Sequence, residues 1–236
     1  MLCLTIDIDW AHDAVIMDTL ELVERHDTKA TWFVTHKTPV LAEIRAAGGH
    51  ELGIHPNFNP LLDGKPGHAG DTIKKLMDIV PEAVSVRSHS LVRSSRLSVK
   101  FRDFGLTHES NYLLPPQVGA KIGAWRDFSG LIQVPIRWED DVRLLDPSLE
   151  EPVDHLDIID LLVVDIHPIH TFLNTQTIDD YETARNEMDD PVKLQERRRP
   201  RGCGGSRDRL LTLLSEVRAR AMKSCRLGGV KVGKGG

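Results

Sequence analysis

The sequence predicts an α/β fold built on a mainly parallel sheet, and three observations support this. Strand-sized apolar segments alternate with helical patterns, which is typical of parallel strands joined by helices. Seven segments are strand candidates. The chain has 236 residues, of which 40% are hydrophobic, so it can bury one sizeable core. We therefore expect a single domain over residues 1–236, folded as a distorted (β/α) barrel of about seven parallel strands. An open, doubly wound sheet is the alternative, because fully buried strands look alike in both folds.

The strand candidates are residues 2–8, 30–35, 51–55, 83–87, 106–109, 131–136 and 158–166. Helical spacing of apolar residues lies between them, at Ile16, Leu20 and Val23, over residues 40–47, and at Ile73, Leu76, Met77 and Val80. Gly48 and Gly49 end the second of these helices. Residues 210–222 predict a last helix. The turn-like segment 196–209 before it is either a linker or a loop leading into that helix.

Charge is distributed unevenly along the chain. The net charge is −5, yet residues 193–236 carry 13 basic and only 3 acidic residues. The acidic remainder argues against a general nucleic-acid-binding protein. For the basic segment there are two hypotheses. It closes the barrel and pairs with the acidic body, or it holds a phosphate-bearing or lipid-linked substrate near the mouth of the barrel.

Neither a membrane helix nor an export signal is expected. The longest apolar runs are strand-sized, and no basic flank with an apolar core precedes Asp7. Cys3, Cys203 and Cys225 are odd in number and widely spaced, which suits free thiols in a reducing compartment. We therefore expect a cytoplasmic protein. No pattern indicates its oligomeric state.

Ionisable side chains stand at the ends of several predicted strands. Asp7 and Asp9 close the first strand, and His55, Arg87 and His167 close three others. The carboxyl ends of parallel strands converge on one mouth, where active sites of such folds are built. Asp7 and Asp9 leave the same face of their strand, so a divalent metal or Arg87 is needed to offset their repulsion.

Two further segments supply candidate ligands and acids. Asn59 follows His55 by four residues, so a tight turn can bring an imidazole and an amide oxygen to one metal. His167 and His170 lie directly after the most apolar strand candidate, and one of them is suited to give a proton to a leaving group. Trp10, Trp125 and Trp138 are candidate sugar contacts. The acidic residues 139–141 are interpreted as a solvated loop, with a place at the mouth as the alternative.

Five segments, in chain order, resemble the motifs of NodB-type polysaccharide deacetylases. They are residues 5–10 (TIDIDW), 30–34 (ATWFV), 49–55 (GHELGIH), 87–90 (RSHS) and 165–167 (DIH). The resemblance spans residues 2–170 and is closest to the WbmS-like branch of lipopolysaccharide O-antigen clusters, through D-x-D-W, G-I-H-P-N-F-N and H-P-I-H. It implies a distorted (β/α) barrel and metal-dependent hydrolysis of an N-acyl amide on a sugar.

The resemblance also implies roles for individual residues. Asp7 matches the general base, Asp9 a metal ligand, His55 the first histidine ligand, Arg87 the arginine that orients the base, and His167 the general acid. Asn59 stands where the family has its second histidine ligand. Metal, base and acid would together activate water and release the amine.

Two departures from the family pattern leave alternatives open. Ile8 separates two aspartates that are adjacent in the usual motif, so Asp7 and Asp9 could exchange roles. The amide of Asn59 is a weaker zinc partner than an imidazole, so the metal is zinc, a harder divalent ion, or lost. His170 is kept as a substrate contact or as the acid in place of His167.

The expected function is removal of an N-acyl group from a sugar or sugar nucleotide during synthesis of a surface polysaccharide. Two alternatives remain: hydrolysis of a small non-sugar amide, and binding of a glycan without turnover. The sugar and the acyl group are not specified by any pattern in the sequence.

Overall fold

A computed structural model of the chain describes residues 1–116 and 122–233. Within these ranges, nine strands form one sheet in the order β6-β7-β5-β4-β3-β2-β1-β9-β8. Neighbouring strands are parallel, except that β6 and β7 are antiparallel. The strands are β1 (Leu2–Asp7), β2 (Ala30–Val34), β3 (Glu51–Ile54), β4 (Ser85–Val86), β5 (His108–Glu109), β6 (Trp125–Arg126), β7 (Ile132–Gln133), β8 (Trp138–Glu139) and β9 (Leu162–Ile166).

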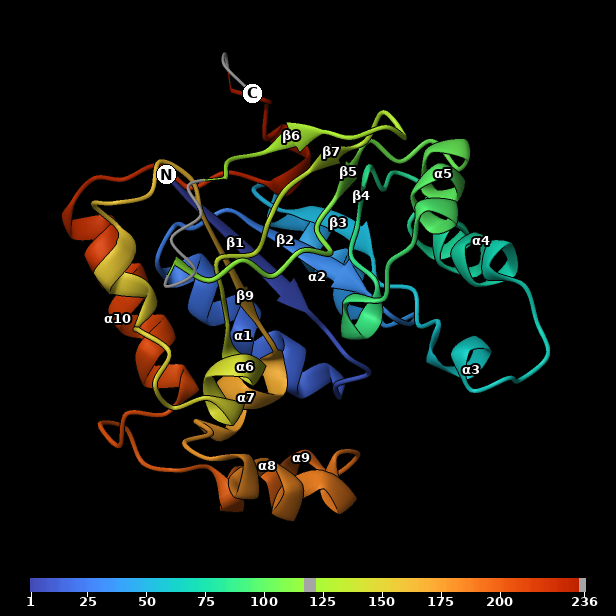
Figure 1. Cartoon of the computed structure of the whole chain (residues 1–236). Helices are drawn as coiled ribbons and strands as arrows, with labels where there is room; N and C mark the ends of the chain where they lie inside the picture. The colour runs from blue at the N-terminus through green and yellow to red at the C-terminus, as the bar shows by residue number, and fades with distance from the viewer. Residues whose placement is uncertain (117–121, 234–236) are drawn as a thin grey trace.

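The sheet curls into an incomplete barrel (Figure 1). Residues 132–139 account for much of this curvature. At their start Ile132 lies opposite His108 of β5, and at their end Trp138 lies opposite Val164 of β9. One stretch of chain thus joins the two flanks of the sheet. The predicted parallel α/β barrel is confirmed and the open doubly wound sheet is excluded, although the strands outnumber the seven expected.

The longer strands were predicted closely, and the short ones were not. β1, β2 and β3 end within one residue of the predicted limits. β4, β5 and β7 keep only two paired residues each. Segment 158–166 becomes a strand only from Leu162, because Ile158 belongs to a turn and is 67% exposed.

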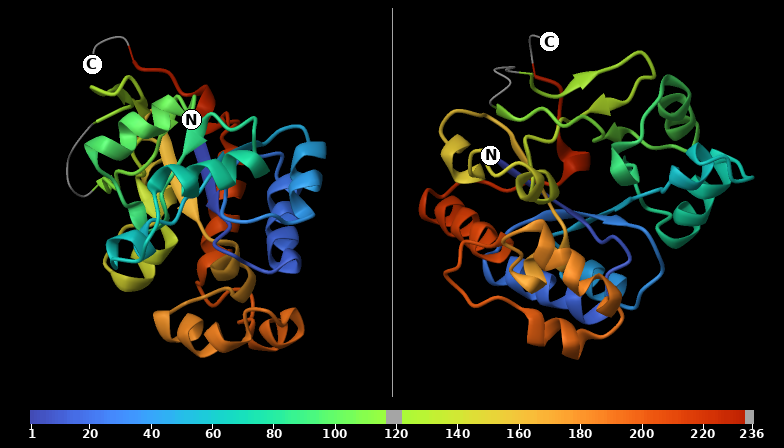
Figure 2. Two further views of the ribbon diagram at one scale, coloured as in Figure 1. Left: turned by 90° about the vertical axis from the view of Figure 1, so that its right-hand side faces the viewer. Right: turned by 60° about the horizontal axis from the view of Figure 1, so that its bottom comes forward.

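Helices surround the sheet, and those within residues 178–197 pack on another helix rather than on the sheet itself (Figure 2). They are α1 (Asp13–Arg25), α2 (Val40–Ala46), α3 (Asn59–Leu62), α4 (Ala69–Ile79), α5 (Ser95–Asp103), α6 (Asp140–Leu145), α7 (Pro168–Leu173), α8 (Ile178–Ala184), α9 (Pro191–Arg197) and α10 (Ser206–Ala219). The His12 side chain caps α1 by accepting a hydrogen bond from the Ala14 N–H, 3.1 Å away. No helix of the described residues is long and apolar enough to cross a bilayer.

The alternation along β1 positions the first site residues. Leu2, Leu4, Ile6 and Ile8 are buried in the cluster that packs against the helices. The intervening residues, Cys3, Thr5 and Asp7, therefore face the interior of the barrel. Asp7 is the last of them and stands at the carboxyl end of the strand.

The basic C-terminal segment packs against the body of the protein. α10 buries Leu210, Leu213, Leu214 and Val217 in the main core. The chain that follows α10 crosses the amino-terminal ends of the strands, where the Leu227 N–H donates to Thr31 Oγ1 (2.8 Å) and the Gly228 N–H donates to Glu51 Oε2 (2.8 Å). Ion pairs join arginines of the basic segment to acidic residues of the body: Arg198–Asp18, Arg207–Asp18 and Arg209–Glu151.

Candidate active site

The carboxyl ends of β1, β3 and β9 bring three predicted residues to one point. His55 Nε2 lies 3.1 Å from Asp9 Oδ1, and His167 Nε2 lies 3.6 Å from Asp9 Oδ2. Asp7 is adjacent, with Oδ2 3.5 Å from His55 Nδ1. Parallel pairing of the strands produces this convergence, because each of these residues ends or follows a strand at the same edge of the sheet.

A strained turn directs Asp9 back over the strand end. Asp9 and Trp10 both have positive φ, 34° and 56°. Left-handed conformations are costly for residues other than glycine and persist where the surrounding structure holds them. Here the Trp10 N–H donates to Thr35 Oγ1 (3.1 Å) and the Ala11 N–H donates to the Ile8 carbonyl (2.8 Å). The turn places Asp9 between histidines that come from three different segments.

Asp9, His55 and His89 form a group suited to a divalent cation. One ligand atom from each lies within 4.8 Å of the others. His55 is buried, and its two ring nitrogens lie near the carboxylates of Asp9 and Asp7 without forming a well-directed hydrogen bond to any described residue. Buried polar atoms without a hydrogen bond are rare in proteins, and a cation between His55 and Asp9 would bind one of these nitrogens. One carboxylate and two imidazoles are donors that zinc accepts, and other divalent ions also bind such sets.

The charge state of Asp9 fits the same interpretation. Burial by itself would raise the pKa of this carboxyl, but the neighbouring His55 and His89 rings hold it below its ordinary value. Asp9 is therefore ionised at any pH at which the protein would be assayed. A metal ligand must be in this deprotonated form.

His89 is the residue that the sequence analysis missed. It opens a 3-10 turn, η1 (His89–Leu91), and its Nδ1 lies 3.2 Å from Asp9 Oδ1. The following residues, Ser90 and Leu91, also have positive φ. The available signal was spacing: Arg87 and His89 repeat the two-residue separation of Asp7 and Asp9 at another strand end.

Asn59 stands beside this group at the start of α3. Its Nδ2 donates to Ser90 Oγ (3.1 Å), and its backbone N–H donates to Asn57 Oδ1 (2.9 Å). The amide thus supports the turn that carries His89. Asn59 therefore helps to position the turn of His89, in addition to the role of metal ligand predicted from its spacing to His55.

Arg87 fills the barrel interior beneath Asp7. It is fully buried and donates from Nη1 to Asp7 Oδ1 (3.0 Å) and Thr5 Oγ1 (2.9 Å), and from Nη2 to Ser110 Oγ (2.9 Å). Asp165 forms a second ion pair with the same guanidinium. Burial opposes the charge of Arg87, but Asp165 and Asp7 raise its pKa above the ordinary value. Arg87 therefore holds Asp7 in one orientation.

Asp140 holds His167 in place. Asp140 Oδ1 lies 2.7 Å from His167 Nδ1, and Oδ2 accepts the His167 backbone N–H at 2.9 Å. This leaves His167 Nε2 facing Asp9. Burial favours the neutral ring, but the negative charges of Asp141 and Asp140 raise the pKa of His167 well above its ordinary value. Both ring nitrogens of His170 are occupied, near Asp141 Oδ1 (2.6 Å) and Thr175 Oγ1 (3.2 Å).

The acidic residues 139–141 are not a solvated loop, so that interpretation was wrong. β8 pairs with β9, which puts Glu139 opposite Asp165 and carries the following residues to the mouth. Asp140 is only 1% exposed. β8 and β9 are far apart in the sequence, and no local pattern predicts that they pair.

Two of the three predicted tryptophan contacts, Trp10 and Trp138, differ in their surroundings. Trp10 is 47% exposed at the rim, and its ring meets that of His89 edge-on at 5.1 Å. Trp138 is 2% exposed, lies in the main core and donates from Nε1 to the Glu150 carbonyl (3.1 Å). Along β8, Trp138 points to the face opposite Glu139. Its burial contradicts the predicted sugar contact.

The buried carboxyl of Glu139 should make the stability of the protein depend on pH. Burial raises the pKa of its carboxyl from 4.5 to about 7. When a carboxyl has a higher pKa in the folded protein than in the unfolded chain, its protonated form stabilises the fold. This stabilisation is complete at a pH below the unfolded-state pKa and is lost as the pH rises through the folded-state pKa. Glu139→Gln should therefore match the wild type near pH 4 and exceed its stability above about pH 8 by about 3 kcal/mol. Urea unfolding of both proteins at the two pH values measures the difference; an equal difference at both would contradict it.

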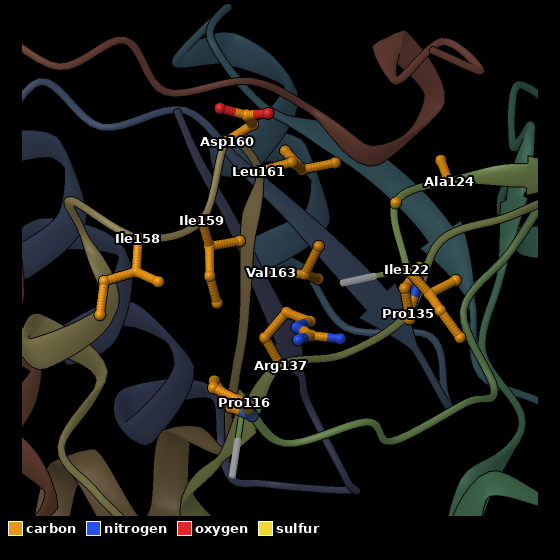
Figure 3. Close-up of a pocket in the computed structure, with 11 residues that line it drawn as sticks. Pro116, Ile122, Ala124, Pro135, Arg137, Ile158, Ile159, Asp160, Leu161 and Val163 are labelled. Atoms are coloured by element: carbon orange, nitrogen blue, oxygen red, sulfur yellow. The ribbon is translucent and has the colours of Figure 1, made fainter. Parts of the chain in front are cut away.

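A separate cavity of about 240 Å³ lies near the amino-terminal end of β9 (Figure 3). Its lining is largely apolar, with Arg137 and Asp160 as the charged residues. Leu161 and Val163 line it from the start of β9, whereas His167 follows the other end of that strand. The cavity is therefore not part of the strand-end site.

The chain is similar to proteins of known family and structure. A family model described as WbmS-like polysaccharide deacetylase matches residues 4–185. The crystal structure of WbmS from Bordetella bronchiseptica, assigned to polysaccharide deacetylation in O-antigen biosynthesis, is 38% identical, with a TM-score of 0.83 over 91% of this chain and 89% of that one. A search of the curated proteins found no match.

More distant structures share the fold alone. The peptidoglycan deacetylase PdaC from Bacillus subtilis is 14% identical, with a TM-score of 0.52 over 95% of this chain and 86% of that one. A family 4 acetyl xylan esterase from Clostridium thermocellum, in complex with a cobalt ion, is 13% identical, with a TM-score of 0.50 over 96% and 87% of the two chains.

Proposed function

Because the chain belongs to the WbmS-like family of polysaccharide deacetylases, we propose that it is a metal-dependent hydrolase that removes an N-acyl group from a sugar or sugar nucleotide. The observation that carries this proposal is the Asp9–His55–His89 group, flanked by Asp7 and by His167. A cation site with a candidate base and a candidate acid beside it is what hydrolysis of an unactivated amide requires.

The similarity to WbmS suggests the biological setting. That protein is assigned to O-antigen biosynthesis and is similar along most of both chains. We place the present protein in the synthesis of a comparable surface polysaccharide, on a precursor in the cytoplasm. All three cysteines are free thiols, as a reducing compartment would keep them.

The metal would be held by Asp9, His55 and His89, with zinc as the first candidate. When bound, such an ion acidifies water and polarises a carbonyl group. Asn59, beside His89, is the position to test for a further ligand. The cobalt ion of the distant acetyl xylan esterase fits with a divalent metal in this fold.

Asp7 is the proposed base, and the contacts of the two aspartates support this choice between their roles. Arg87 and His55 contact its two oxygens, whereas Asp9 faces the histidines. A carboxylate fixed by a guanidinium keeps one orientation and accepts a proton from an attacking water in that orientation. Asp9 is correspondingly assigned to the metal.

His167 is the proposed acid, and His170 supports its surroundings. Because Asp140 occupies Nδ1, His167 can present a proton only from Nε2, toward the site. An amine leaves readily only when protonated, so this proton would complete C–N cleavage. His170 is engaged at both nitrogens and is assigned to the orientation of Asp141.

The direct test is an assay with a panel of N-acylated sugars, nucleotide sugars and small non-sugar amides. We expect mass spectrometry to detect a free amine and a free carboxylic acid only with sugar substrates, and chelation to abolish the reaction. If only the non-sugar amides were hydrolysed, the substrate would be a small amide rather than a sugar. Glycan binding without turnover, in a protein that binds no divalent ion, would refute hydrolysis.

Trp10 is the proposed platform for the sugar ring. Trp10→Ala is expected to raise KM roughly 3- to 10-fold and to leave kcat nearly unchanged, because stacking contributes about 0.5–1.5 kcal/mol of binding. Phe128→Ala is the control, since Phe128 is 72% exposed in the turn between β6 and β7. Equal effects of the two substitutions on KM would argue against a specific role of Trp10.

A further inference from the structure

Two of the three cysteines, distant in sequence, are neighbours at the amino-terminal end of the sheet. Residues 222–230, here called the strap, form an isolated parallel bridge with β1 at Leu2 and Ser224. The Leu2 N–H donates to the Lys223 carbonyl (3.0 Å), and the Cys225 N–H donates to the Leu2 carbonyl (2.9 Å). The next pair in this register is Cys3 and Cys225. Figure 1 shows the strap beside the start of β1.

The two thiols share one environment inside the barrel. Cys3 is fully buried in a cluster with Phe33, Val163 and Leu227, and Cys225 packs against the same cluster. The interaction of the two neighbouring thiols raises the pKa of Cys3 and lowers that of Cys225. Cys225 is also the more exposed of the two. It is therefore the thiol with more thiolate character and better access for a reagent.

We propose that Cys3 and Cys225 form an oxidation-sensitive pair that hydrogen peroxide converts into a disulfide between β1 and the strap. In the first step the Cys225 sulfur attacks the O–O bond, takes one oxygen as a sulfenic acid and releases one water. In the second step the Cys3 sulfur displaces that oxygen as a second water and the S–S bond forms. Two thiols lose two electrons in total, and one peroxide is reduced to two waters.

The backbone geometry permits this bond. Paired strands lie about 4.7–4.9 Å apart, which falls inside the Cα separation of about 4.4–6.8 Å found across disulfides. Both side chains leave the same face of the two-stranded pairing because they stand in register. The strap is held to β1 by an isolated bridge, so its main chain can make the small approach that the sulfurs require.

The bond would connect the two ends of the core. It closes a loop from the first strand to the strap, and cross-links over long loops restrict the unfolded chain most. The strap also contacts Thr31 and Glu51 at the starts of β2 and β3. Oxidation would therefore fix the strap to β1, β2 and β3, at the end of the barrel opposite Asp9.

The test exposes the full chain to stoichiometric hydrogen peroxide and then counts free thiols by alkylation and mass spectrometry. We expect the count to fall from three to one, with Cys203 alkylated and one peptide pair joined through Cys3 and Cys225. The unfolding temperature should rise by roughly 5–10 °C and return to its starting value with dithiothreitol.

Two serine variants control this experiment. Cys225→Ser should keep both remaining thiols at the same peroxide dose and show no rise in unfolding temperature. Cys203→Ser should behave as the wild type and lose both of its thiols to the cross-link. Three surviving thiols in the wild type, a cross-link that includes Cys203, or a disulfide between two chains on a non-reducing gel would each overturn the proposal.

Discussion

Replacing Asp7 with Asn is expected to lower kcat by roughly 10²–10⁴-fold while divalent-metal binding stays intact. Asp7 touches the proposed cation site only through His55, at 3.5 Å, and its other oxygen is held by Arg87. The amide keeps the shape of the carboxylate but cannot take a proton from water. The loss should therefore appear in kcat rather than in KM.

The fold should tolerate this substitution. Arg87 also contacts Asp165, Thr5 and Ser110, so it stays paired when the carboxylate of Asp7 is removed. Calorimetric titration with zinc or cobalt, together with the unfolding temperature, separates a lost base from a damaged site. A large loss of metal affinity in this variant would mean that Asp7 is a ligand.

Asp9→Asn is the matched comparison. We expect it to weaken metal binding by more than about 100-fold and to abolish activity for that reason. Excess metal should restore part of its activity but none of that of Asp7→Asn. If excess metal rescued both variants equally, the assignment of base and ligand to the two aspartates would fail.

The parts of the fold that could be predicted are those with a strong local pattern. β1, β2 and β3 are continuous apolar runs ended by polar residues, and the alternation of strand and helix between them is clear. β6 and β8 hold two residues each; β6 pairs with β7 across a short turn, whereas β8 depends on pairing with the distant β9. A two-residue strand carries no periodicity, so the sequence could not reveal it.

The same limit explains which site residues were missed. Asp7, Asp9, His55, Arg87 and His167 end or follow strands that were predicted, and the structure brings them together. Asp140 reaches His167 only because β8 joins β9. His89 faces Asp9 through turns with positive φ, which ordinary residues adopt only when tertiary contacts hold them. Trp138 was misassigned because the pairing of β8 with β9 decides which side chains of β8 face the core.

His167→Gln is expected to lower kcat on an amide by roughly 10²–10⁴-fold and to remove the alkaline limb of its pH profile. A general acid must be protonated to act, and the raised pKa of His167 keeps it protonated through neutral pH. The loss of wild-type activity on the alkaline side should therefore follow dissociation of that proton.

Asp140→Asn tests the cause of this behaviour. Asp140 is one of three carboxylates, with Asp141 and Asp9, that raise the pKa of His167, so its neutralisation lowers that pKa. The alkaline limb should then move to lower pH. The amide oxygen can still accept the Nδ1–H, but the amide nitrogen cannot accept the His167 backbone N–H that Oδ2 accepts in the wild type. His170→Gln is the control: it leaves these carboxylates in place and should not move the limb to lower pH.

An activated substrate distinguishes proton donation by His167 from a structural role. An aryl ester of the same acyl group leaves as a stabilised phenolate and needs no protonation. His167→Gln should therefore retain most of its activity on the ester, although it has lost the amide reaction, and Asp7→Asn should lose both because each reaction needs an activated water. Equal losses of His167→Gln on amide and ester would show that the histidine shapes the site rather than donating the proton.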